Sequence, residues 1–190
     1  YYWLTYFTAN PHIFNIPRKG CFRDYEAYKH FKEIIEIWDF GWDRVRGTVH
    51  PKVVNIAVLA HGVRNRSIIH YLQPHFPYIG KIKMSIGVYQ KHVNRMKIVH
   101  KHGVDKVREA YKENLRMVLL YVQDVIRRLP DKRIIITADH GEGLGEYNNF
   151  FFHDRDKPIL RIVPWLEVKG IKENGDRISI KDKLQQLGYF

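Results

Sequence analysis

Apolar residues recur along the chain with two periods, one typical of strands and one typical of helices. A run of aromatic and β-branched residues over 1–8 predicts a strand that ends before Asn10 and Pro11. Over 105–129, apolar residues recur every three or four positions in a single stripe, which predicts a long helix. Residues 133–137 are centred on three consecutive isoleucines, as in a central parallel strand covered on both faces.

Shorter patterns predict the remaining elements. Pro164 lies inside the last of the predicted strands and implies an edge or a bulge there. Residues 24–37 look helical in their first half, but the pattern leaves 34–38 open between a helix end and a strand. The other predicted elements are a helix from Pro51 to the residue before Gly62, strands over 67–72 and 159–168, and a helix over 180–187.

Strands and helices therefore alternate along the chain. This order predicts an α/β fold with a mostly parallel sheet flanked by helices, formed by one domain over 1–190. We expect the strand at 133–137 near the centre of the sheet and the helix at 105–129 packed on one of its faces.

Composition narrows the class of protein. The chain has 190 residues, of which 45% are hydrophobic and 27% charged, which is typical of a folded globular protein. Cys21 is the single cysteine, so a scaffold of intrachain disulfides is excluded. No apolar run approaches the roughly 18 residues of a membrane span, and we expect a cytoplasmic protein. The net charge of +12 favours anionic partners, and the many Lys, Arg and Ile resemble the composition of heat-adapted proteins.

The most informative motif is Thr137–Glu146, with the sequence TADHGEGLGE. It follows directly on a predicted buried strand, and ligands of α/β sheets bind at the carboxyl ends of strands. Asp139 and His140 offer a carboxylate oxygen and an imidazole nitrogen, the ligands that zinc and related divalent ions use. The three glycines allow the backbone to approach a ligand closely.

This motif resembles the signature of the sulfatase-like branch of the alkaline phosphatase superfamily. The segments 10–12 (NPH), 41–43 (GWD) and 187–189 (LGY) resemble archaeal members of that branch in particular. The resemblance implies that Asp139 and His140 bind a catalytic divalent metal, with zinc, manganese and calcium all open. The segment 70–78, HYLQPHFPY, resembles the turn whose histidine contacts the substrate's sulfate or phosphate, so His75 inherits that role. His153, Lys157 and the segment 161–165 resemble the family's His, Lys and R-V-P strand after the metal motif. The resemblance implies that His153 is a second anion contact or a second metal neighbour, with Lys157 as a weaker candidate.

The resemblance implies a metal-dependent hydrolase or transferase whose substrate is an anionic sulfate or phosphate ester. The family's nucleophile and one or two acidic metal ligands belong to a segment that precedes residue 1 of this sequence. Cys21 does not match the formylglycine pattern. We therefore interpret the chain as the C-terminal portion of a larger catalytic domain, and expect it to be inactive alone. An inactive member of the superfamily remains an alternative.

A basic run over 81–108 carries the other alternative. Its eight Lys and Arg residues and three histidines could contact the phosphates of a nucleic acid. Aromatic residues do not interleave these cations in a stacking pattern, and the run contains no known nucleic-acid-binding motif. Nucleic acid is therefore the less favoured partner, and the oligomeric state is left open.

Overall fold

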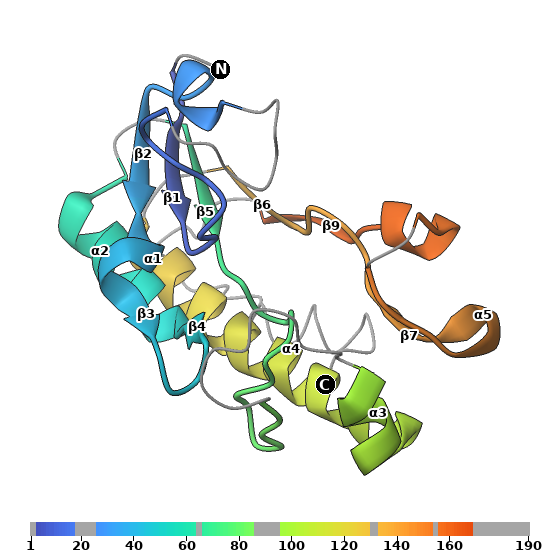
Figure 1. The fold of residues 1–190 in the computed structure, drawn as a ribbon. Helices are drawn as coiled ribbons and strands as arrows, with labels where there is room; N and C mark the ends of the chain where they lie inside the picture. Colours follow the sequence, from blue (N-terminus) through green and yellow to red (C-terminus); the bar gives the residue numbers. More distant parts are fainter. Residues whose placement is uncertain are drawn as a thin grey trace.

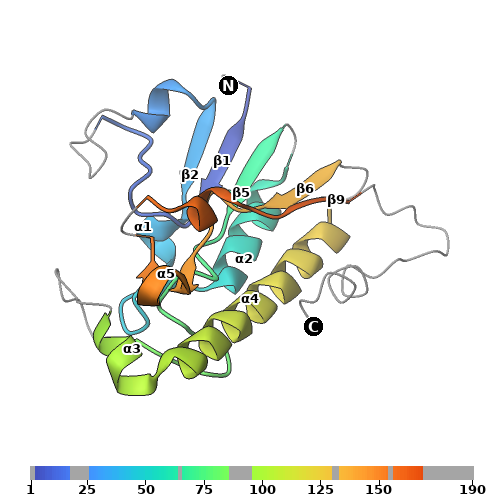
Figure 2. The same cartoon turned by 90° about the vertical axis from the view of Figure 1, so that its right-hand side faces the viewer.

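The chain adopts a mixed α/β fold, in a computed structural model that describes residues 3–17, 26–63, 66–85, 96–129, 133–153 and 156–168. Three short parallel strands form a sheet in the order β2 (Glu33–Glu36), β1 (Thr5–Thr8), β5 (Ser67–His70). Beyond β5 lie β6 (Ile134–Thr137) and β9 (Trp165–Val168), which pair with each other in antiparallel fashion (Figures 1 and 2). The α/β class is confirmed, with a parallel sheet smaller than expected.

One helix, α4 (Val104–Arg127), joins two hydrophobic clusters. The larger cluster packs the C-terminal half of α4 against β1, α1 (Ile37–Gly41) and α2 (Pro51–His61). The smaller cluster packs its N-terminal half against α3 (Met96–His102) and the segments around Tyr78 and Phe152. The single apolar stripe thus serves two cores.

Short elements complete the described chain. Residues 24–37 were expected to begin as a helix, but their described part, 26–37, contains a 3-10 turn followed by β2, so the helix prediction is wrong there. The strand expected over 159–168 begins only after Pro164 and is preceded by a 3-10 turn.

Cys21 and the helix predicted over 180–187 lie outside the described residues. The short elements are η1 (Ala27–Lys29), β3 (Trp42–Asp43), β4 (Thr48–Val49), β7 (Gly143–Gly145), α5 (Glu146–Asn149), β8 (Phe150–Phe152) and η2 (Pro158–Arg161).

Strand β6 corrects the prediction of a parallel strand buried on both faces. Ile134 and Ile136 pack against the larger cluster, whereas Ile135 is 38% exposed. Among the described residues its hydrogen-bonded partner is β9, which runs antiparallel. An unbroken apolar run therefore does not require two covered faces, because antiparallel sheets commonly leave one face open.

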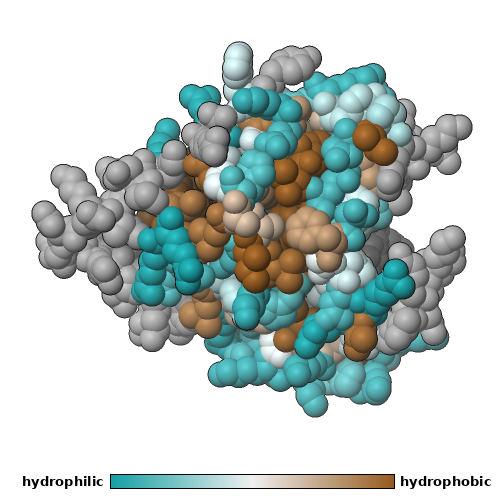
Figure 3. Space-filling view, turned by 90° about the vertical axis from the view of Figure 1, so that its left-hand side faces the viewer, coloured by the Kyte–Doolittle hydropathy of each residue, from teal (hydrophilic) through white to brown (hydrophobic). Residues whose placement is uncertain are grey.

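Helix α2 carries apolar residues on its outer side as well as toward the core. Val54 and Val58 are fully buried, whereas Ile56 is 56% exposed. Figure 3 shows apolar side chains gathered on the face where α2 lies in Figure 1.

No helix in the described part of the chain is both long and apolar enough to cross a bilayer.

The loop that follows β5 is fixed to α4 by one buried amide. Asn114 lies on α4 with its side chain fully buried. Its Oδ1 accepts two backbone N–H groups and its Nδ2 faces three backbone carbonyls, all from residues 74–80. These partners are Ile79 N at 2.8 Å, Gly80 N at 3.1 Å, Pro74 O at 3.2 Å, His75 O at 3.2 Å and Pro77 O at 3.3 Å.

Asn114→Ala is expected to lower the free energy of unfolding by roughly 2–4 kcal/mol, because it leaves several buried backbone groups without a partner. Urea denaturation followed by circular dichroism measures the loss. Leu120→Ala is the matched control on the same helix, since Leu120 is 54% exposed and its truncation should cost less than about 1 kcal/mol. Equal losses in the two variants would contradict the role given to Asn114.

A pH dependence should follow from the first turn of α2. His50 caps this helix, and its Nδ1 accepts a hydrogen bond from Lys52 N at 3.2 Å. Burial and then the charges of Arg46 and Lys52 lower the pKa of His50 from its ordinary value of 6.5. The capping contribution is therefore present above that value and is lost as the pH falls through it toward the lower folded pKa.

We expect the parent chain to lose stability relative to His50→Asn between about pH 7.5 and about pH 5, since asparagine caps without titrating. The difference should stay below about 1 kcal/mol because the ring is half-exposed. Denaturation curves of both proteins across this range measure it. A constant difference would show that protonation of His50 does not break the cap.

Candidate functional site

The ends of β5 and β6 bring an imidazole and a carboxylate together. His70 is the last residue of β5, and Asp139 comes two residues after β6. His70 Nε2 lies 3.9 Å from Asp139 Oδ2. The carboxyl ends of these two strands thus share one edge, the position where α/β sheets bind ligands.

Three histidines from separate segments lie in ring contact beside this edge. His140 follows Asp139, His75 comes from the loop held by Asn114, and His153 follows β8. The ring centroids of His140 and His153 are 4.4 Å apart, and those of His75 and His153 are 5.0 Å apart. The fold therefore brings together four of the residues singled out from the sequence: His75, Asp139, His140 and His153.

Each of three rings in this group has its Nδ1 engaged by a neighbour. His140 Nδ1 lies 2.7 Å from the carbonyl oxygen of Gly141, and His153 Nδ1 lies 3.0 Å from Glu142 Oε1. His70 Nδ1 lies 2.7 Å from the hydroxyl of Tyr6. Such contacts fix the orientation of each ring, as in metal and catalytic sites.

The two carboxylates beside these histidines, those of Glu142 and Asp139, differ in their exposure to solvent. The side chain of Glu142 is 6% exposed, and that of Asp139 is 64% exposed. Glu142 therefore serves as an internal partner of His153, whereas Asp139 is open to a ligand from solvent. Burial lowers the pKa of His70, and the Asp139 carboxylate opposes that shift.

The loop that carries Asp139 and His140 is held by backbone contacts. Gly141 N donates to Leu160 O at 2.8 Å, and Arg108 Nε donates to Leu144 O at 2.7 Å. A Cβ on Gly141 would lie 2.2 Å from Ile159 O, so only glycine fits between these two chains. Phe152, directly before His153, has a left-handed φ of 67°, a strained conformation that is common beside functional residues.

Lys157 is placed differently from the histidines. Its Nζ lies 5.9 Å from the ring centroid of Tyr147, in a cation–π contact. The structure thus gives Lys157 an aromatic partner outside the ring contacts of His75, His140 and His153. Its role toward a substrate stays a prediction.

The donors present match a divalent metal in chemistry but not in number. His140 Nε2 lies 3.9 Å from Asp139 Oδ1, and two ligands about 2.1 Å from one zinc ion lie roughly 3–4 Å apart. Within the described ranges, no group of three or more His, Cys, Asp or Glu side chains is arranged to hold a metal. Asp139 and His140 could therefore supply two ligands, and a complete site would need more.

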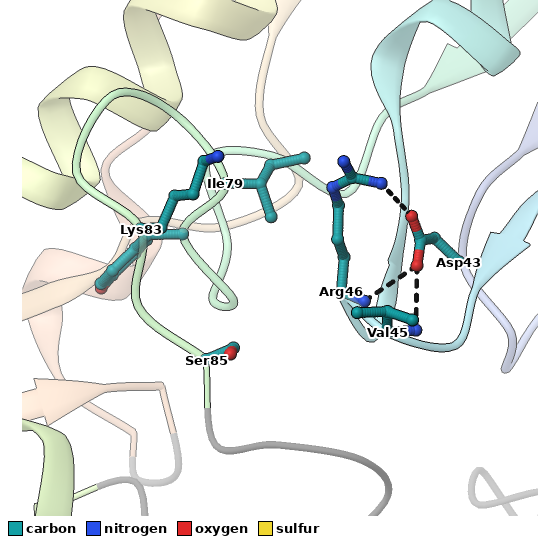
Figure 4. Close-up of a pocket in the computed structure, with 7 residues that line it drawn as sticks. Asp43, Val45, Arg46, Ile79, Lys83 and Ser85 are labelled. Carbon is teal, nitrogen blue, oxygen red and sulfur yellow. Dashed lines mark hydrogen bonds and ion pairs between the residues drawn. The ribbon is translucent and has the colours of Figure 1, made fainter.

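A separate cavity of about 420 Å³ lies on another part of the surface, between the turn after β3 and the hairpin around Met84. Figure 4 shows Arg46 bonded to Asp43 on one wall, with Lys83 and Ser85 opposite. Its lining contains none of the four histidines described above. The ion pair between Arg46 and Asp43 offsets part of the positive charge of this cavity. Because the lining residues differ, we treat the cavity as separate from the histidine site, the group formed by His70, His75, Asp139, His140 and His153.

Sequence reasoning missed His70, which begins the HYLQPHFPY segment but received no role there. Its signal is its position, because it ends β5 just as Asp139 follows β6. Buried Glu142 was also missed as a partner of His153, although it lies within the TADHGEGLGE motif. Both omissions concern residues whose importance depends on which strands and loops become neighbours.

Comparisons with known proteins return no relative. No protein-family model, curated protein or solved structure matches this chain. Any functional conclusion therefore depends on the side chains that the fold brings together and on the resemblance of the motifs.

Gly141→Ala is expected to displace the Asp139–His140 loop and to lower the free energy of unfolding by roughly 2–4 kcal/mol, because its methyl group meets a backbone carbonyl. Thermal and urea unfolding measure the loss. Gly62→Ala is the comparator, since that site is open but has a φ of +78°, and its backbone strain should cost only about 1–2 kcal/mol. A smaller loss for Gly141→Ala than for Gly62→Ala would contradict the close approach.

Proposed function

We propose that this chain carries the metal-binding and anion-contacting part of a divalent-metal-dependent hydrolase or transferase that acts on sulfate or phosphate esters. Asp139 and His140 would hold the metal, and His75 and His153 would contact the anionic group of the substrate. Support comes from the resemblance of the motifs to sulfatase-like proteins and from the grouping of these residues.

The single observation that carries the proposal is the ring contact of His75, His140 and His153. These histidines come from different loops, so their proximity does not follow from sequence distance. Packing polar rings against one another brings little stability by itself, and clusters of titratable side chains are common at functional sites. The exposed Asp139 beside them adds a carboxylate that a metal could reach.

The chemistry expected of these residues is electrostatic. When bound, the metal would polarise an ester oxygen and lower the pKa of an attacking hydroxyl. His75 and His153 would stabilise the negative charge that develops on sulfuryl or phosphoryl oxygens. The carboxylate of Glu142 would hold the ring of His153 in a fixed orientation toward the substrate.

Metal binding tests the first half of the proposal. We expect Zn²⁺ or Mn²⁺ to bind the purified chain in isothermal titration calorimetry, and Asp139→Ala to weaken that binding by at least about tenfold, since one of two ligands is lost. Asp105→Ala is the matched control, because this aspartate is 99% exposed on α4. Equal affinity in parent and Asp139→Ala would refute the assignment of Asp139.

Anion binding tests the second half. Sulfate or phosphate should shift the imidazole NMR signals of His75 and His153, and His75→Asn should weaken the affinity several-fold, with exposed His100→Asn as control. We expect the chain alone not to turn over p-nitrophenyl sulfate or phosphate, because the resemblance assigns the nucleophile to none of its residues. Metal-dependent turnover that Asp139→Ala abolishes would show that one of these residues does attack.

A further inference from the structure

Tyr6 and His70 form a chain of polar contacts that leads to Asp139. The Tyr6 hydroxyl lies 2.7 Å from His70 Nδ1, and His70 Nε2 lies 3.9 Å from Asp139 Oδ2. The resemblance to sulfatase-like proteins gives no role to either residue. Two of the three groups belong to adjacent parallel strands, so their relative positions are set by the sheet.

The sheet register explains why the two rings meet. Thr8 of β1 is opposite His70 of β5, so Tyr6 is the diagonal neighbour of His70 on the same face. The rings of Tyr6 and His70 are stacked at 5.9 Å with an angle of 12°. Phe31 packs on Tyr6 at 4.8 Å, which restrains the tyrosine ring further. The imidazole is therefore held by backbone pairing and by aromatic packing.

The contacts of the ring favour one tautomer of neutral His70. A lone pair on Nε2 would face the Asp139 carboxylate and be repelled, whereas an N–H there would be attracted. With the proton on Nε2, Nδ1 would accept a hydrogen bond from the Tyr6 hydroxyl. The distance of 3.9 Å is longer than a hydrogen bond, but catalytic contacts often tighten only when a ligand binds.

We propose that Tyr6 and His70 are positioning residues that orient the Asp139 carboxylate for a divalent metal. This inference rests on the proposed function, since it assumes that Asp139 binds the metal. Asp139 is 64% exposed, and its Oδ1 accepts a hydrogen bond from His140 N at 3.1 Å. An N–H donor on Oδ2 would fix the second oxygen as well, so that the carboxylate keeps one orientation and presents its remaining lone pairs to the metal, as ligands held by outer partners do.

The test measures Zn²⁺ affinity by calorimetry and the tautomer of His70 by ¹⁵N-imidazole NMR of the metal-free chain. We expect His70→Ala to weaken Zn²⁺ binding by about 10–100-fold. His70→Gln should recover most of that loss, because its amide N–H₂ reaches the place of Nε2–H. Tyr6→Phe should weaken binding by a few-fold and should raise the Nδ1–H fraction of His70.

The matched control is His61→Gln, because His61 also faces a carboxylate, Glu33, at 3.1 Å, outside the site. A His70→Gln variant as weak as His70→Ala would overturn the inference, and so would a parent chain whose His70 is mainly Nδ1–H. Chemical denaturation of each variant excludes unfolding as the cause, and Tyr6→Phe keeps the ring that packs on Phe31.

Failure of the proposed function has a different signature. If Asp139→Ala leaves Zn²⁺ binding intact, or the parent does not bind Zn²⁺, the metal site itself is wrong and the positioning role falls with it. If Asp139→Ala abolishes binding while His70→Ala does not, the metal site stands and only the role of Tyr6 and His70 is refuted.

Discussion

The buried amide of Asn114 is the contact on which the arrangement of the histidine site depends. It forms the hydrogen bonds that the backbone groups of this loop would otherwise make with water. The loop contains two prolines and has no regular strand or helix of its own. Buried backbone groups without partners are costly, so the amide stabilises the shape of this loop. His75 lies within the loop, and its backbone carbonyl is one of the groups that contact Asn114, so α4 helps to place this histidine beside His153.

The other side of the site is built on a different principle. The segment after β6 is short and rich in glycine, and it is held mainly through its backbone atoms. Arg108 of α4 donates a hydrogen bond to one of these atoms, Leu144 O. The side chains of Asp139 and His140 are left exposed to solvent to different degrees, 64% and 37%. One half of the site is thus fixed by a buried polar side chain and the other by close approach of the main chain, and both halves are anchored to the same helix.

Local patterns in the sequence predicted the long helix and the strands β1, β5 and β6, because their signals lie within a few neighbouring residues. They failed within residues 24–37, where a helix-like spacing of apolar residues occurs in a segment that forms a 3-10 turn and then a strand. The isoleucines of β6 indicated a strand correctly, but they predicted neither its open face at Ile135 nor the direction of its partner strand, since pairing with β9 is a property of the fold. The motif residues Asp139, His140 and His153 could be selected from sequence, whereas the interest of His70 and Glu142 arises only from their neighbours in space.

The sharing of α4 between two clusters has a consequence for motion. The helix continues from one cluster into the other, but the side chains of Val107 and Val125 belong to separate packing units. Units of this kind can open independently of one another. The smaller unit holds Phe152, next to His153, while the larger one holds the sheet edge with the carboxylate. Amide hydrogens around Phe152 should therefore exchange through local opening that leaves β1 and β5 protected. The histidine site can then open locally without loss of the sheet that supports it.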